Sequence, residues 1–209
     1  MVLLKLDCFD ILSLMKIDRP KSKQPLPENA QKVFEGVMFD VYQWEQEMFD
    51  GTKETFEKLK RPDTVVVFAV LNDGKILLTK QEQPGTKEPF IGGAGGRVDP
   101  GEDILDAAKR ELVEETGYEA DEFTLWKALQ PIGKIEWAVY VFVARKLKKI
   151  SELSLDAGEK IEVMAVDFNE FTKIALQENF YEQEVYRDIV EAMLNPEKKS
   201  ELEKLLSAS

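Results

Sequence analysis

The segment Gly96–Tyr118, GRVDPGEDILDAAKRELVEETGY, carries the densest pattern in this 209-residue chain. It places a glycine, a lone glutamate and an Arg-Glu/Glu-Glu cluster at set intervals: Gly96, five residues, Glu102, seven residues, Arg110-Glu111-Leu112, one residue, Glu114-Glu115, one residue, Gly117-Tyr118. The apolar spacing within it predicts a helix over 103–116. Gly117 suits the left-handed position that ends such a helix.

Three carboxylates share one face of this helix. Residues three and four apart are neighbours on a helix, so Glu111, Glu114 and Glu115 crowd together and repel one another. Hard divalent cations prefer oxygen ligands and would relieve that repulsion. Arg110 can pair with Glu102 or Glu114 and hold the geometry. The alternative is a merely exposed acidic helix, but the glycines, Arg110 and Glu102 at these spacings favour a metal site.

Composition restricts the chemistry further. The chain has no histidine and a single cysteine, Cys8. These counts exclude Ser-His-Asp and Cys-His catalysis, a zinc site of the usual Cys/His kind and a disulfide within one chain. Acid–base work falls to carboxylates, Lys, Tyr or metal-bound water. The cysteine count fits a reducing compartment, so we expect a cytoplasmic location.

The charge of the chain bears on its partners. It holds 28 basic and 40 acidic residues, net −12. Such a chain is a poor general binder of nucleic acid or anionic membrane, so we expect neither partner. Residues 1–15 are interrupted by Lys5, Asp7 and Asp10, which excludes a signal or membrane-spanning segment and favours a short packed helix or strand. The acidic excess after residue 150 predicts a solvated helical surface.

The whole sequence divides into four regions. Pro20, Pro25 and Pro27 predict that 1–31 form an N-terminal extension and linker. A strand over 33–44, a turn at Asp50-Gly51 and a return strand over 55–60 predict an antiparallel β-meander at 32–62. The main domain is expected at 63–195, and a C-terminal helix or tail at 196–209, started by Asn195-Pro196.

The expected main domain mixes strands and helices. A hairpin over 64–71 and 75–79, turned by Asn72-Asp73-Gly74, opens it. The sequence also predicts strands near 123–128, 135–145 and 161–167, and helices near 169–177 and 182–194. This alternation predicts an α/β layered fold.

The segment Gly96–Tyr118 resembles the Nudix hydrolase signature G-x5-E-x7-R-E-U-x-E-E-x-G-U, where U is a bulky aliphatic residue. All seven fixed positions match, and only the last U departs, as Tyr118. The resemblance implies an α/β/α sandwich with a mixed sheet that hydrolyses nucleoside diphosphate derivatives with Mg²⁺, or with Mn²⁺ in its place. It implies these roles: Glu111 and Glu115 as main metal ligands, Glu114 assisting through metal or metal-bound water, the Gly95 carbonyl as a backbone ligand, and Glu102 with Arg110 as the orienting pair.

The wider layout is similar to the ADP-ribose pyrophosphatase branch of that family. The resemblance implies a homodimer and an adenine pocket built with the N-terminal strands. Trp44 is then either an adenine-stacking residue or simply core or dimer interface. Gln83, Gly96 and Pro131 become candidate substrate-binding residues. Glu159 is the candidate general base, with a solvated loop glutamate as the alternative.

Two departures from the branch keep the substrate open. The branch usually carries E-L-P-A-G where this chain has Gly92-Gly93-Ala94-Gly95-Gly96. It often carries R-Q-Y-R where this chain has Lys80-Gln81-Glu82-Gln83, so Gln83 replaces a phosphate-contacting arginine. Neither change touches the Nudix signature itself.

The expected function is Mg²⁺-dependent hydrolysis of the pyrophosphate bond of ADP-ribose or a related nucleoside diphosphate sugar. Its products would be a nucleoside monophosphate and a sugar phosphate. The alternatives are a Nudix hydrolase of a dinucleoside polyphosphate, NADH, coenzyme A or a nucleoside triphosphate, and a non-catalytic nucleotide-sensing domain. The N-terminal meander argues against a minimal triphosphatase, and the complete glutamate set argues against a sensor.

Overall fold

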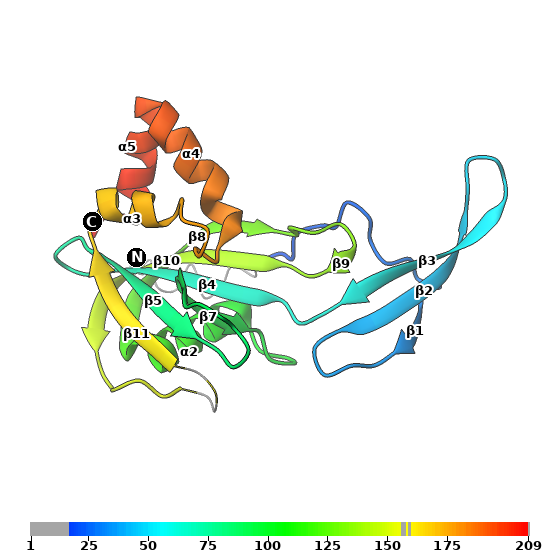
Figure 1. Cartoon of the computed structure of the whole chain (residues 1–209), viewed down its shortest axis with the longest axis horizontal. Helices are drawn as coiled ribbons and strands as arrows, with labels where there is room; N and C mark the ends of the chain where they lie inside the picture. Colours follow the sequence, from blue (N-terminus) through cyan, green and yellow to red (C-terminus); the bar gives the residue numbers. More distant parts are fainter. Residues whose placement is uncertain (1–16, 156–157, 159, 209) are drawn as a thin grey trace, which may run out of the picture.

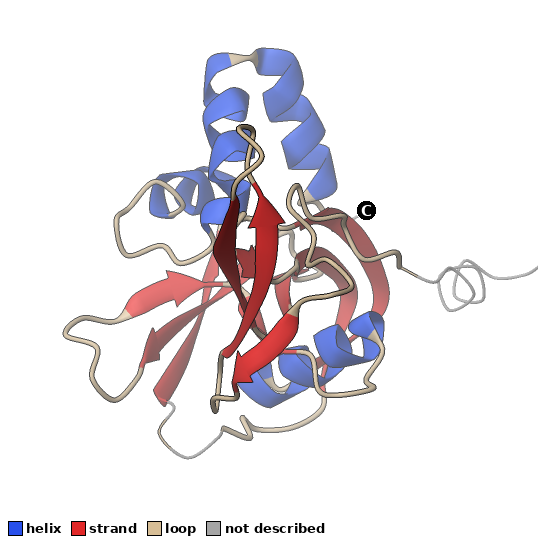
Figure 2. Ribbon diagram, turned by 90° about the vertical axis from the view of Figure 1, so that its right-hand side faces the viewer, coloured by secondary structure: helices blue, strands red, loops and turns tan. Residues whose placement is uncertain are grey.

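The computed structural model describes residues 17–155, 158 and 160–208 (Figure 1). The helix or strand expected within 1–15 and the candidate base Glu159 lie outside these residues. The described chain is an α/β fold with a large mixed sheet, a smaller sheet and helices on both faces of the large one (Figure 2).

The large sheet forms the centre of the molecule. Its strands run in the order β11 (Lys160–Val166), β5 (Ile76–Glu82), β4 (Thr64–Val70), β10 (Val139–Lys149) and β8 (Tyr118–Leu129), with β6 (Phe90–Gly92) paired to β5 and β7 (Ala94–Arg97) paired to β4. The β4–β10 pair is parallel, and the other pairs of this sheet are antiparallel. The predicted hairpin around Asn72-Asp73-Gly74 is confirmed as β4–β5.

Strand β4 is buried on both faces, as its continuous apolar run indicates. Alternate side chains of a strand point to opposite faces. Val66, Phe68 and Val70 pack with α3 (Phe168–Ile174), α4 (Tyr186–Leu194) and α5 (Pro196–Leu205). The other face of β4 packs against α2 (Ile104–Thr116). The α/β/α sandwich expected from the sequence is therefore present.

Helix α2 begins and ends where the sequence predicts. The side chain of Asp103 caps it by accepting a hydrogen bond from the backbone N–H of Leu105. Gly117 ends it at φ +73°, a conformation that costs glycine little. Ala108 and Leu112 are fully buried beneath the sheet. Glu111, Glu114 and Glu115 lie on a different face of α2, and this second face lines a cleft.

The C-terminal helices differ slightly from expectation. Helix α3 is shorter than the predicted 169–177, and a 3₁₀ turn, η1 (Gln183–Val185), precedes α4. Asn195 caps α5, with Pro196 at its first position, as predicted. No helix of the described residues is long and apolar enough to cross a membrane.

The smaller sheet contains the meander, which extends away from the large sheet (Figure 1). Its order is β1 (Gln31–Phe34), β2 (Asp40–Glu47), β3 (Lys53–Lys60) and β9 (Ile135–Glu136). The single strand expected over 33–44 is wrong, because the chain turns between β1 and β2. At that turn Gly36 passes so close to the Phe39 carbonyl that a Cβ would clash with it. Strand β9, from far along the chain, adds itself parallel to β3.

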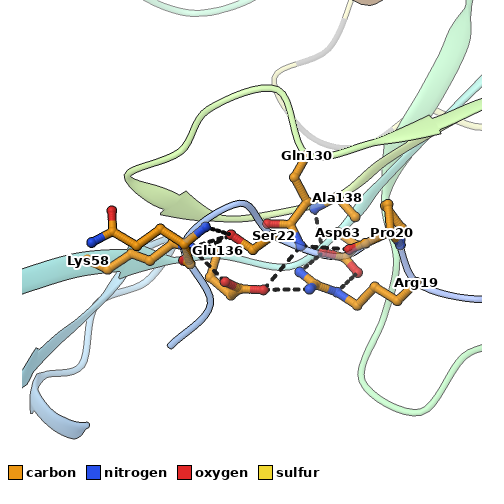
Figure 3. Close-up of polar contacts among 9 residues, drawn as sticks. Arg19, Pro20, Ser22, Lys58, Asp63, Gln130, Glu136 and Ala138 are labelled. Atoms are coloured by element: carbon orange, nitrogen blue, oxygen red, sulfur yellow. Dashed lines mark hydrogen bonds and ion pairs between the residues drawn. The ribbon is translucent and has the colours of Figure 1, made fainter. Parts of the chain in front are cut away.

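A buried polar network ties the meander to the main domain (Figure 3). The Lys58 ammonium is fully buried and donates to Glu136 at 2.7 Å and to Ser22 Oγ at 2.9 Å. Arg19 binds both Asp63, at 2.8 Å, and Glu136, at 2.5 Å. The network therefore joins the linker, β3, β9 and the start of β4.

We expect Glu136→Ala to lower the free energy of unfolding by about 3 kcal/mol, because it strands the buried Lys58 without its anion. Glu45→Ala removes the exposed Lys53–Glu45 pair and should cost at most about 1 kcal/mol. Urea titration of both variants measures the difference. Equal losses would show that the network contributes nothing beyond a surface pair.

Candidate active site

A cleft of about 490 Å³ opens beside α2, bounded by β4, β5, β7 and the segment before α4. The acidic residues of α2 and the glycines of β7 line one part of it. Cationic residues line it as well: Arg61, Arg97 and Arg110. Two aromatic residues complete the wall, Phe90 and Tyr181. The cleft thus combines groups that bind cations, anions and rings.

The glycine-rich run is a pair of strands and brings the backbone close to α2. A side chain at Gly95 would clash with the Val65 carbonyl, so only glycine lets β7 lie this close to β4. A side chain at Gly96 would clash with the carboxylate of Glu111. The structure therefore places strand β7, which contains the predicted backbone ligand Gly95, beside the predicted metal ligand Glu111.

Arg110 joins the carboxylates of the signature. It donates to both oxygens of Glu102, from Nε at 2.9 Å and from Nη2 at 3.0 Å. Its Nη1 donates to Glu111 at 2.8 Å and to Glu114 at 3.1 Å. The predicted pairing with Glu102 and Glu114 is confirmed. The hydrogen bonds from Arg110 are the main cause that lowers the pKa of the Glu102 carboxyl.

Glu115 is buried and held from the opposite side. Its carboxylate accepts hydrogen bonds from the Gly95 backbone N–H at 3.0 Å and from Gln81 Nε2 at 3.3 Å. Gln81 Nε2 also donates to Thr79 Oγ1 at 3.0 Å. Gln81 is not among the site residues that the sequence predicts. The pattern that indicates it is the alternation of two polar residues, Thr79 and Gln81, on the buried face of an otherwise apolar strand.

The donor set suits a hard divalent cation. Its ligands are all oxygens, and the absent Cβ of Gly96 leaves space beside Glu111. Within 17–155, 158 and 160–208, no three His, Cys, Asp or Glu side chains lie close enough to form a ready-made metal site. Arg110, Gln81 and the Gly95 N–H hold the carboxylate oxygens instead. A cation bound by these carboxylates would have to exchange some of these hydrogen bonds for metal–oxygen bonds.

The candidate substrate-binding residues separate into two groups. Gln83 and Gly96 line the cleft. Trp44 does not line it; it is buried in the meander sheet, edge-to-face on Phe56 at 6.0 Å, with its indole N–H donating to Gln46. Pro131 is exposed and does not line the cleft either. Their roles in substrate binding stay predictions.

Arg61 is a cleft residue that the sequence argument did not single out. Its guanidinium lies 4.7 Å from the Trp137 ring centre and 5.7 Å from that of Phe39. Burial lowers the pKa of Arg61, and its Nε has no hydrogen-bond partner among the described residues. A desolvated guanidinium in a cleft can hold a phosphate oxygen.

The protein is an α/β/α sandwich in which helix α2, with its glutamates, and the glycine strand β7 face one cleft. This is the arrangement that the Nudix resemblance implies. Residues 60–189 match the NUDIX domain family, and the chain belongs to this family. Its members generally use divalent metal ions.

Particular relatives share much of the chain. An ADP-ribose pyrophosphatase of Bacillus subtilis (strain 168) is 32% identical over 154 residues, which cover 73% of this chain and 83% of the relative. A methanol dehydrogenase activator of Bacillus methanolicus is 26% identical over 156 residues, 73% and 84% of the two chains. The crystal structure of an ADP compounds hydrolase has the same fold, with a TM-score of 0.66, 23% identity and coverage of 85% and 97%.

We expect Gly96→Ala to weaken Mn²⁺ binding at least about tenfold, because the new Cβ displaces the Glu111 carboxylate. Gly133→Ala is the matched control, since a Cβ there meets open space. Electron paramagnetic resonance of free Mn²⁺ measures both affinities. Unchanged binding in Gly96→Ala would remove Glu111 from the metal site.

We expect Glu102→Gln to lower the free energy of unfolding at pH 7 by about 1 kcal/mol, because Arg110 loses one of its three charged partners. The folded pKa of Glu102 is lowered, so its stabilisation is present above the unfolded pKa and is lost as pH falls through the folded one. Urea unfolding should therefore show the gap between wild type and variant closing below about pH 4. A gap that persists in acid would contradict this origin.

Proposed function

We propose that this chain hydrolyses the pyrophosphate bond of ADP-ribose or a related nucleoside diphosphate sugar, giving a nucleoside monophosphate and a sugar phosphate. The observation that carries the proposal is the placement of Glu111, Glu114 and Glu115 along one cleft beside the glycine strand. The cleft volume falls in the usual range for small-molecule sites. The similarity to a B. subtilis ADP-ribose pyrophosphatase supports this substrate class.

Mg²⁺ is the proposed cofactor, with Mn²⁺ able to substitute. Glu111 and Glu115 would be its main ligands, with Glu114 and the Gly95 carbonyl completing the protein donors. Bound there, the cation supplies charge neutralisation at the pyrophosphate, polarisation of phosphorus and a lower pKa for the attacking water. This explains how an acidic chain handles an acidic substrate.

The protein side chains position these groups. Arg110 stays anchored through both oxygens of Glu102 when Glu111 and Glu114 turn toward a cation. Gln81 and the Gly95 N–H keep the Glu115 carboxylate in place. Arg61 and Arg97 line the cleft and supply the positive charge that Gln83 does not. Glu159 remains the proposed general base.

We also infer a homodimer formed through the meander. Its support is a set of exposed apolar side chains around β1 and the β2–β3 turn: Val33, Phe34, Val37 and Phe49. In such a dimer Trp44 and Pro131 would contribute to the substrate pocket. A cytoplasmic location is proposed from the cysteine count alone.

We expect Glu115→Gln to lower kcat at least about 100-fold, because an amide cannot neutralise a cation. The assay is release of AMP and ribose 5-phosphate from ADP-ribose with Mg²⁺. Glu119→Gln is the matched control, since Glu119 is an exposed glutamate four residues on. Full activity in Glu115→Gln would contradict the proposal that Glu115 is a metal ligand.

The substrate class needs its own panel: ADP-ribose, other ADP- and GDP-sugars, NADH and nucleoside triphosphates, each with Mg²⁺ and with Mn²⁺. Preference for a nucleoside diphosphate sugar supports the proposal. Preference for a nucleoside triphosphate would contradict the proposed substrate class. Tight ligand binding without turnover would favour a sensor instead.

A further inference from the structure

The short segment before α4 is fastened to the edge of the cleft. The backbone of Ile91 donates to Asn179 O at 2.9 Å, and the Tyr181 N–H donates to Ile91 O at 2.9 Å. Phe180 makes a parallel bridge to Ile91 and is buried against Phe68. Strand β6 therefore fixes the positions of Tyr181 and Glu182.

An aromatic pair lies at this edge. The ring centres of Phe90 and Tyr181 are 4.9 Å apart and the rings are tilted by 34°. Both residues line the cleft, and Tyr181 is 65% exposed. A large exposed ring in a polar cleft offers a face on which a planar ligand can stack.

Glu182 follows directly and is almost fully buried, at 5% exposure. It lines the same cleft, yet its Oε2 has no hydrogen-bond partner among the described residues. The three atoms nearest to a Cβ built on Gly92 all belong to this carboxyl group. Gly92, which replaces the glutamate of E-L-P-A-G, thus makes room for a carboxyl group from another element.

A buried, incompletely paired carboxyl group costs stability unless something uses it. Burial raises the pKa of Glu182 to about 8; the backbone of Glu182 and that of Gly93 work in the opposite direction, and Glu184 adds to the rise. The group is therefore protonated at neutral pH, with one O–H donor and one carbonyl acceptor.

We propose that Phe90, Tyr181 and Glu182 form a second subsite of the cleft, which takes the nucleobase of the nucleotide sugar. The base stacks on Tyr181 and its polar edge hydrogen-bonds the Glu182 carboxyl group. This rests on the proposed function and deepens it, because the glutamate helix and the subsite line one cleft. A neighbouring donor and acceptor match N7 and the N6 amino group of adenine, whereas guanine offers two acceptors, N7 and O6, on the same edge.

The first test varies base and sugar separately. ADP-glucose and GDP-glucose differ only in the base, and ADP-ribose and ADP-glucose differ only in the sugar and in the sugar carbon that carries the pyrophosphate. Tyr181→Ala should lower kcat/KM roughly tenfold for all of them, because stacking is tolerant of the base. Glu182→Ala should change the ADP-glucose to GDP-glucose ratio at least about fivefold and leave the ribose to glucose ratio within about twofold. A shift in the sugar ratio instead would overturn the assignment.

Matched controls lie on the same segment. Tyr186→Ala and Glu178→Gln remove an aromatic ring and an exposed carboxylate that do not line the cleft, so both should behave as wild type. Gly92→Ala should reproduce Glu182→Ala, because its Cβ displaces the carboxyl group. Wild-type specificity in Gly92→Ala would contradict the proposal.

The closing experiment needs no turnover. Calorimetry of AMP binding should show a roughly tenfold loss in Tyr181→Ala and in Glu182→Ala, with ribose 5-phosphate binding unchanged. Glu182→Gln keeps a donor and an acceptor, so it should retain most of the AMP affinity. AMP affinity that no variant changes, or an equal loss for ribose 5-phosphate, would overturn the subsite. Selective AMP loss in a chain without hydrolase activity would support the subsite and sink only the proposed function.

Discussion

One guanidinium group holds the active face of α2 together. Glu111 and Glu114 both accept from Arg110 Nη1, and Glu102 takes the other edge of the fork through both oxygens. Without that charge the mutual repulsion of the carboxylates on this face would be stronger. The planar fork of five donors allows this sharing, which a lysine ammonium could not reproduce with the same geometry. The helix, the loop at Glu102 and the strand carbonyl of Arg97 are thereby locked as one unit.

The parts of the fold that depend on neighbouring residues were predictable. Asn72-Asp73-Gly74 marks a turn, and Asp103 and Gly117 cap α2, because turns and caps are local chemistry. The glycine run 91–96 was not assigned to strands, since glycine alone favours loops and its partners β4 and β5 lie elsewhere in the sequence. Candidate site residues follow the same division. The signature spacing identifies the α2 carboxylates, whereas Gln81 and Glu182 reach the cleft only through tertiary pairing.

Glu102, which pairs with the cleft residue Arg110, and Glu182, which lines the cleft, show how surroundings decide the chemistry of one functional group. Glu102 accepts two hydrogen bonds from the Arg110 guanidinium, which lower the pKa of its carboxyl group. Glu182 is buried without a cation, and its pKa rises to about 8. The first is therefore an acceptor at neutral pH, and the second is a donor as well as an acceptor. The pKa values of the two carboxyl groups are shifted in opposite directions. A protein without histidine can in this way have both a charged acceptor and a neutral donor among its glutamates.

The distribution of these groups also explains how a chain of net charge −12 can accept a phosphate ligand. A divalent cation at the acidic part of the cleft, as proposed, would reverse the local charge. Arg61 and Arg97 add positive charge to the same cleft that Gln83 lines. Phe90 and Tyr181 add aromatic surface to the same cleft. The phosphates and the base of one nucleotide sugar would therefore contact different kinds of side chain, which favours a single orientation of the ligand.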